Sequence, residues 1–199
     1  MEMVVDSMPF VHPADHVPGP RQGAWTYANY AALPDDGQRY EIIDGVLYMP
    51  PAPGAPHQSA STKFATYLTI HVEFAGLGRV FHAPFDVELA PNTVVQPDVV
   101  VVLNDNLGVL KPSRIIGAPD LVIEVISPST GGYDRRQKQD AYARAGVREY
   151  WIADPHAQTV ELLRLQDDSY RVIGVYHNRA ILPSEVIPNM PVRVEQFFA

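Results

Sequence analysis

The sequence contains no cysteine, which excludes disulfide bonds and thiolate metal sites. It also lacks an apolar run of about 18 residues, the length that a membrane-spanning helix needs, so we expect no membrane span. The first residues show neither the basic stretch nor the apolar block of a signal peptide. Together these absences favour a cytoplasmic protein.

Basic residues are also in short supply, because 15 Lys and Arg stand against 23 Asp and Glu and leave a net charge of −8 at pH 7. A protein that holds nucleic acid mainly through its phosphates normally carries a basic surface. The charge balance therefore argues against a sequence-independent nucleic-acid binder, although it leaves room for a local basic groove.

The remaining composition is that of a globular protein: 199 residues, 46% hydrophobic and 19% charged, suit one domain with a substantial core. Residues 1–23 are rich in Pro, His, Asp and Gly, which predicts a flexible N-terminal arm. We expect a single domain at 24–199.

Two stretches of mostly β-branched residues, 99–103 and 121–126, are typical of central strands that are buried on both faces. Asp98 lies at the entrance of the first and Glu124 near the middle of the second. A carboxylate on such a strand is costly unless it is paired, hydrogen-bonded or bound to a metal. The pair therefore indicates a metal site, and the alternative is two carboxylates satisfied by backbone amides or arginine.

The elements around these two strands alternate between helix and strand. Apolar spacing and turn residues predict helices at 26–33, 57–75 and 134–145, hairpins at 39–49 and 159–176, and strands at 94–103 and 148–153. The segment 79–89 is expected to form either one strand bent at Pro84 or two short strands. The fold class is therefore α/β (α+β), with a central mixed β-sheet flanked by helices. Pro97 is expected to bend the chain just before Asp98, and 104–117 to form a surface loop.

The two carboxylates suit magnesium, which typically takes one or two protein carboxylates and completes its shell with water and substrate phosphate. Such an ion would polarise a phosphoryl oxygen and lower the pKa of a bound water. Lys138, one turn and one helix after Glu124, is the candidate for stabilising charge on the phosphate. Glu41, in the first hairpin, is expected to reach the same site as a further ligand or as a base.

Each of these assignments has a simpler alternative. Lys138 would form an ordinary helix ion pair with Asp134, four residues earlier, and Glu41 would be a solvated residue at a strand edge. For His57, near the start of a helix, a position facing the site is one alternative, and a structural or solvent-exposed role is favoured over it. Tyr142 is expected to pack in the core.

These residues resemble the PD-(D/E)XK nuclease superfamily, in which an acidic residue follows Pro-Asp by one strand and a lysine stands two positions later. The longer match is to the Uma-two (Uma2) family of putative restriction endonucleases and covers about 26–194. The match is carried by YEIIDG at 40–45, His57, QPDV at 96–99, EVISPST at 124–130, Asp134, Lys138, Tyr142 and GVREYWIADP at 146–155.

The resemblance implies a restriction-endonuclease-like core at 24–199 and a Mg²⁺- or Mn²⁺-dependent endonuclease that hydrolyses phosphodiester bonds of DNA. It implies catalytic roles for Glu41, Asp98, Glu124 and Lys138, with the metal held by Asp98, Glu124 and Glu41. One departure stands out, because the superfamily's lysine position is Ile126 here. The resemblance suggests that Lys138 on the following helix supplies the amine instead.

Two other functions compete with the nuclease. A catalytically inactive nuclease-fold module that binds DNA or a protein partner is favoured by the acidic charge and by Ile126. A glycosidase using Glu41 and Glu124 ranks last, because it needs two carboxylates across a sugar cleft, and the sequence shows no aromatic platform. Hydrophobic edges at the C-terminal hairpin permit a homodimer, which would suit an enzyme that cuts both strands.

Overall fold

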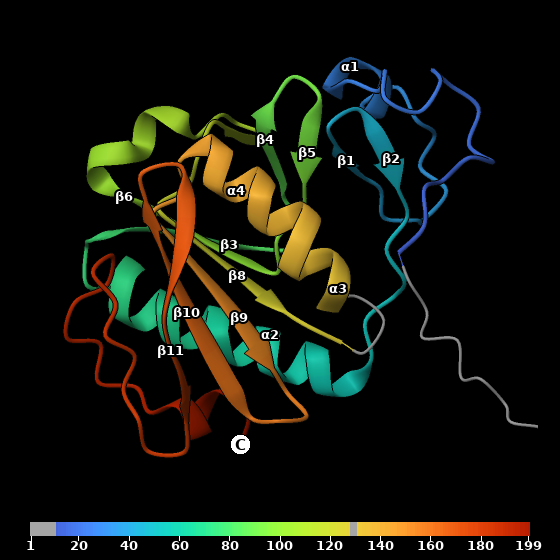
Figure 1. Ribbon diagram of the computed structural model, residues 1–199. Coiled ribbons are helices and arrows are strands. Elements are labelled where there is room, and N and C mark those ends of the chain that lie inside the picture. The colour runs from blue at the N-terminus through green and yellow to red at the C-terminus, as the bar shows by residue number, and fades with distance from the viewer. Residues whose placement is uncertain (1–10, 128–130) are drawn as a thin grey trace, which may run out of the picture.

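The computed structural model describes residues 11–127 and 131–199, which form two mixed β-sheets with helices against them (Figure 1). The first sheet has the order β2-β1-β5-β4-β7 and consists of β1 (Glu41–Ile43), β2 (Val46–Tyr48), β4 (Asp86–Ala90), β5 (Thr93–Val95) and β7 (Arg114–Ile116). The second has the order β11-β10-β9-β8-β6-β3 and consists of β3 (Gly78–His82), β6 (Val99–Leu103), β8 (Leu121–Val125), β9 (Glu149–Asp154), β10 (Thr159–Gln166) and β11 (Ser169–His177).

The helices are short apart from two. The first long one is α2 (Ala55–Leu68), which continues as the π-helical turn η1 (Thr69–Glu73). The second combines α3 (Gly131–Tyr133), η3 (Asp134–Lys138) and α4 (Gln139–Ala145), and ends at Gly146 in the left-handed conformation, as the sequence predicts. Short helices are α1 (Tyr27–Tyr30), η2 (Asn104–Val109) and η4 (Val194–Phe197). In the described part of the chain, no helix has the length and apolar character to cross a membrane.

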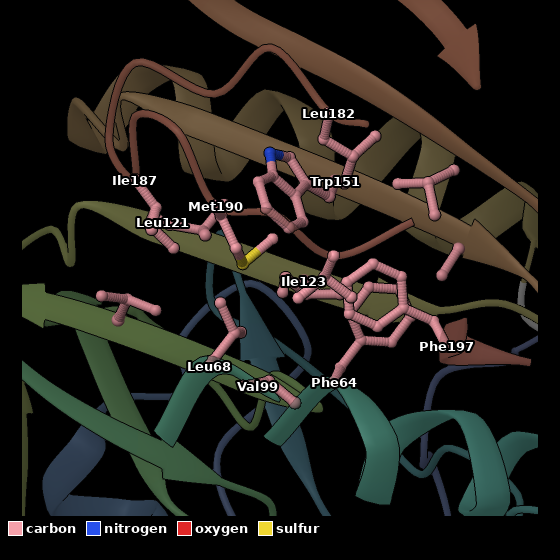
Figure 2. Packing of buried hydrophobic residues seen from close by; sticks show 14 of the residues in the cluster. Phe64, Leu68, Val99, Leu121, Ile123, Trp151, Leu182, Ile187, Met190 and Phe197 are labelled. Carbon is pink, nitrogen blue, oxygen red and sulfur yellow. The ribbon is translucent and has the colours of Figure 1, made fainter. Parts of the chain in front are cut away.

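The central strands β6, β8 and β9 of the six-stranded sheet are buried on both faces, as their apolar residues predict, because α2 covers one face and α4 the other (Figure 1). Side chains alternate along a strand, so Leu121 and Ile123 of β8 pack toward α2 and Val122 toward α4. On the α2 side, Phe64 stacks on Phe197 with ring centroids 4.0 Å apart (Figure 2). Because Glu124 follows Val122 by two residues on β8, its side chain also faces α4.

The mixed α/β class is as predicted, but the expected single sheet is two. The predicted strand at 94–103 is divided into β5 and β6, which belong to different sheets. The division falls at Gln96, Pro97 and Asp98, where the proline bends the chain as expected. Asp98 therefore lies where the chain passes from one sheet to the other.

The surface loop predicted at 104–117 is wrong, because this segment forms η2 and the strand β7, which pairs in parallel with β4. Ile115 is fully buried in this strand. Three residues are too few to show an alternating pattern, so the sequence offered no periodic signal for β7.

The predicted N-terminal arm lies partly outside the described residues, since 1–10 are not among them. Residues 11–23 run beside β2, where the Ala14 amide donates to the Leu47 carbonyl at 2.8 Å and the Gly23 amide to the Gly45 carbonyl at 2.8 Å. This part of the chain is therefore joined to the edge of the five-stranded sheet. A boundary at residue 23 and the flexibility of the arm stay predictions.

The buried acid Glu149 joins the C-terminal segment to the six-stranded sheet. Glu149, only 1% exposed, accepts hydrogen bonds from Trp151 Nε1 (3.2 Å), Ser184 Oγ (2.7 Å) and the backbone amide of Glu185 (2.6 Å). The guanidinium of Arg164 lies 3.6 Å from Glu149 Oε1. The carboxylate thus satisfies donors from three separate segments.

We predict that Glu149→Gln lowers the free energy of unfolding by about 1–3 kcal/mol, because the amide presents donors where the native carboxylate accepts. Urea denaturation followed by circular dichroism measures the change. The matched control is Glu185→Gln, whose side chain is 67% exposed and pairs with the same Arg164; it should cost less than about 1 kcal/mol. Equal stability of the two variants would show that the buried network is not important.

Candidate active site

Four separate segments bring the predicted site residues together in the interior. Glu41 comes from β1, Asp98 from the turn before β6, Glu124 from β8 and Lys138 from η3. Their exposed fractions are 0%, 5%, 3% and 4%. Such burial excludes the alternative of a solvated glutamate at position 41.

Lys138 joins two of the acids directly. Its Nζ lies 3.0 Å from Glu41 Oε1 and 3.0 Å from Glu124 Oε1. Because Glu41 belongs to the five-stranded sheet and Glu124 to the six-stranded one, the ammonium bridges the two sheets. The alternative was an ion pair between Lys138 and Asp134, and the side chain of Asp134 lies outside the residues that the structure describes.

Glu41 is hydrogen-bonded at both oxygens. Its Oε1 accepts from the Gln96 amide at 2.9 Å as well as facing Lys138, and its Oε2 accepts from the Tyr133 hydroxyl at 3.2 Å. These hydrogen bonds fix the position of the Glu41 carboxylate, and the carboxylate in turn fixes the position of the Lys138 ammonium.

Glu124 is oriented by Tyr142, whose hydroxyl donates to Oε1 at 2.6 Å. Burial, and then the charge of Glu124, raises the pKa of Tyr142 well above its ordinary value. The phenol therefore keeps its proton and stays a donor. The sequence assigned Tyr142 to core packing, and the structure adds this hydrogen bond to the packing of its ring against Tyr150.

Asp98 is held by the neighbouring strand and by α2. Its Oδ2 accepts from the Val125 amide at 2.8 Å and lies 3.1 Å from His57 Nε2. The buried Nδ1 of His57 has no hydrogen-bond partner within the described residues. The sequence favoured a structural or exposed His57, and its contact with Asp98 was not anticipated.

A small cavity of about 110 Å³ lies over these groups, with room for several waters. His57, Asp98, Glu124 and Lys138 line it, together with the loop at 50–54. A larger groove of about 790 Å³ adjoins it and shares Asp98, His57, Pro53 and Arg39. Asp98 therefore lies where the small cavity meets the larger groove, and Glu124 lines the small cavity alone.

Arg39 is a cation of this site that the sequence analysis did not single out. Its guanidinium donates to the Gln96 carbonyl at 2.8 Å and to Gln96 Oε1 at 3.3 Å, and it lines both the cavity and the groove. The residue is the first of the hairpin predicted at 39–49, where nothing in the local pattern distinguishes it from a surface arginine.

The donors on the cavity fit a hard divalent cation in type and number. Asp98 and Glu124 are two carboxylates, and Mg²⁺ commonly takes one or two from the protein and oxygens of water and substrate for the rest. Across the described residues, no group of three or more His, Asp or Glu side chains is arranged to hold a metal ion. Glu41 is not among the residues that line the cavity, and its role as a third ligand stays a prediction.

Comparison with known proteins points to one family. The family model Uma2, described as "Putative restriction endonuclease", matches residues 27–195. The uncharacterized protein slr1290 of Synechocystis sp. is 26% identical over 133 residues, which are 66% of this chain and 68% of that protein.

A crystal structure titled as a putative nuclease belonging to DUF820, from Anabaena variabilis, superposes with a TM-score of 0.71 and 21% identity. The similarity covers 87% of this chain and 97% of that one, and it shows that the two share a fold. With the family model matching most of its length, the chain belongs to the Uma2 family of putative restriction endonucleases.

Proposed function

We propose that the protein is a metal-dependent endonuclease that hydrolyses phosphodiester bonds of DNA. The observation that carries this proposal is the buried ammonium of Lys138, 3.0 Å from both Glu41 and Glu124, beside a cavity that Asp98 and Glu124 line. Burying charges costs several kcal/mol per ion before pairing recovers it. A cluster of buried charges on a cavity is typical of a functional site.

In this proposal Asp98 and Glu124 would hold Mg²⁺ or Mn²⁺. When bound, the ion supplies Lewis acidity at the phosphate and lowers the pKa of an attacking water. The amide of Val125 and the hydroxyl of Tyr142 hold the two carboxylates in place. The protein thus orients its ligands before the substrate arrives.

Lys138 stabilises the negative charge that develops on the phosphoryl oxygens, and Glu41 directs the ammonium toward them. The position at which the superfamily carries its lysine holds Ile126, whose side chain packs against the α4-side core. The amine therefore reaches Glu124 from the helix rather than from the strand. Arg39, at the mouth of the cavity, is placed to bind a neighbouring phosphate.

The second candidate function is a catalytically inactive module that binds DNA or a protein partner. It is favoured by the ion pairs that Lys138 already makes with two carboxylates and by the net charge of −8. The glycosidase has no such support, because the ammonium of Lys138 contacts both Glu41 and Glu124 where a sugar would have to lie. A homodimer stays a prediction; β11 is the edge of its sheet and exposes Val172 and Val175.

We predict that Asp98→Asn and Glu124→Gln each reduce Mg²⁺- or Mn²⁺-dependent DNA cleavage by roughly 100-fold or more, because each removes one charged ligand. Cleavage of labelled oligonucleotides and of plasmid DNA measures the loss, and circular dichroism checks the fold. Asp105→Asn, an exposed acid on η2, is the matched control and should cleave like the wild type. Cleavage retained in either site variant would contradict the assigned roles.

Calorimetric titration with Mn²⁺ separates the two candidate functions. The nuclease requires binding by the wild type that is at least about tenfold weaker in Asp98→Asn, in keeping with the loss of a direct ligand. If the wild type binds no Mn²⁺, the inactive module is the better account.

We predict that Lys138→Met abolishes cleavage and lowers the free energy of unfolding by about 3–5 kcal/mol, because it leaves two buried carboxylates without their counter-ion. Urea denaturation measures the stability, and cleavage is assayed where the variant is shown to be folded. Lys63→Met makes the same exchange on α2, where the ammonium donates to the Ser59 hydroxyl at 3.2 Å, and should change the stability by less than about 1 kcal/mol. An unchanged stability of Lys138→Met would show that the bridge between the sheets is not needed.

A further inference from the structure

We infer that the groove along α2 binds an unpaired DNA strand and leads it to the two acids, so that the substrate class is single-stranded DNA or the unpaired part of a junction. The inference rests on the proposed function, since it places the scissile phosphate at Asp98. The shape, charge and side chains of the groove carry it.

The groove is continuous with the candidate active site. It has a volume of about 790 Å³ and lies between α2 with η1 on one side and the turn at His82, Ala83 and Pro84 on the other. Asp98 and His57 line both the groove and the small cavity. A strand with one phosphate at Asp98 therefore has its next nucleotides in the groove.

The groove carries little charge. Arg39 and Asp98 are its only lining residues that are fully charged at pH 7, within the described part of the chain, and they offset each other. A protein that grips duplex DNA through its backbone neutralises several phosphates with Lys and Arg. This groove lacks the cations for that, so its binding energy has to come from the bases, which only an unpaired strand exposes.

One row of helix residues supplies suitable contacts. Positions four apart lie on the same side of a helix, and the row that lines the groove is Gln58, Thr62, Thr66, Ile70 and Phe74. It offers an amide and hydroxyls toward the end where His57 lies and two large apolar side chains at the far end. From His57 to Leu68 the α-helix rises about 16 Å, at about 1.5 Å per residue, and η1 extends the row to Phe74, so that the row spans several nucleotides.

The apolar end of the row is exposed to an unusual degree. Phe74 is 80% exposed and Ile70 is 45% exposed, one turn apart. Exposed large apolar side chains that lie together mark binding surfaces. Base stacking on an aromatic ring is tolerant of sequence and strong enough to serve here, at about 1–3 kcal/mol per base.

Fluorescence anisotropy with a labelled 20-mer tests the inference on the full chain, with EDTA present so that no cleavage occurs. The single strand should bind at least about tenfold more tightly than the duplex of the same sequence, with a shallow dependence on salt because few phosphates are neutralised. Equal or tighter binding of the duplex would overturn the inference.

Phe74→Ala should weaken binding of the single strand about tenfold through the loss of one stacked base. The matched control is Leu77→Ala, since Leu77 is 46% exposed, three residues further on, and is not among the groove's lining residues. A second pair, Thr66→Glu in the groove against Ser59→Glu outside it, should show the same contrast. Equal binding by the members of both pairs would overturn the inference.

The outcomes separate this inference from the proposed function. Single-strand binding that depends on Phe74, without any cleavage in Mg²⁺ or Mn²⁺, would support the groove and overturn the nuclease. Cleavage with a preference for duplex would support the nuclease and overturn the groove. If light scattering shows a dimer that Phe74→Ala dissociates while strand binding is unchanged, the groove is a contact between two copies and the inference fails.

Discussion

The ammonium of Lys138 is the interaction on which the rest of the site depends. Glu41 and Glu124 come from different sheets, and each is too deeply buried for bulk water to solvate its charge. One amine, 3.0 Å from both, pairs with both carboxylates at once, and hydrogen bonds from Gln96, Tyr133 and Tyr142 stabilise the negative charge that remains. The packing of the two sheets and the assembly of the candidate active site are therefore linked, because an acid from each sheet shares the one ammonium that η3 supplies.

Local pattern was enough to predict the elements that carry the site. The apolar strands, the hairpin at Asp44 and Gly45 and the helix that ends at Gly146 are all present. Burial on both faces of β8 also follows from its run of apolar residues, and that burial is what made Glu124 conspicuous in the sequence. Lys138 needed more than pattern, because its reach to Glu124 was suggested by a family resemblance and not by spacing.

The features that sequence reasoning missed depend on contacts between distant segments. The passage between sheets at Pro97 sends β5 and β6 to different neighbours, and proline indicates a bend without indicating which strands pair beyond it. The contact of His57 with Asp98 and the place of Arg39 at the cavity mouth arise only when α2 and β1 are packed. A lone histidine and a lone arginine carry no local signal of such positions.

The acidic charge of the chain and a nucleic-acid substrate are compatible once distance is considered. At physiological salt the screening length is about 8 Å, so acids on remote surfaces scarcely affect a phosphate held in the cavity. The charged groups close to such a phosphate would be Lys138 and Arg39, together with carboxylates whose charge a divalent ion would neutralise. On the proposed function, affinity for DNA would come largely from groups that recognise bases, and we assign that role to the apolar end of the α2 groove.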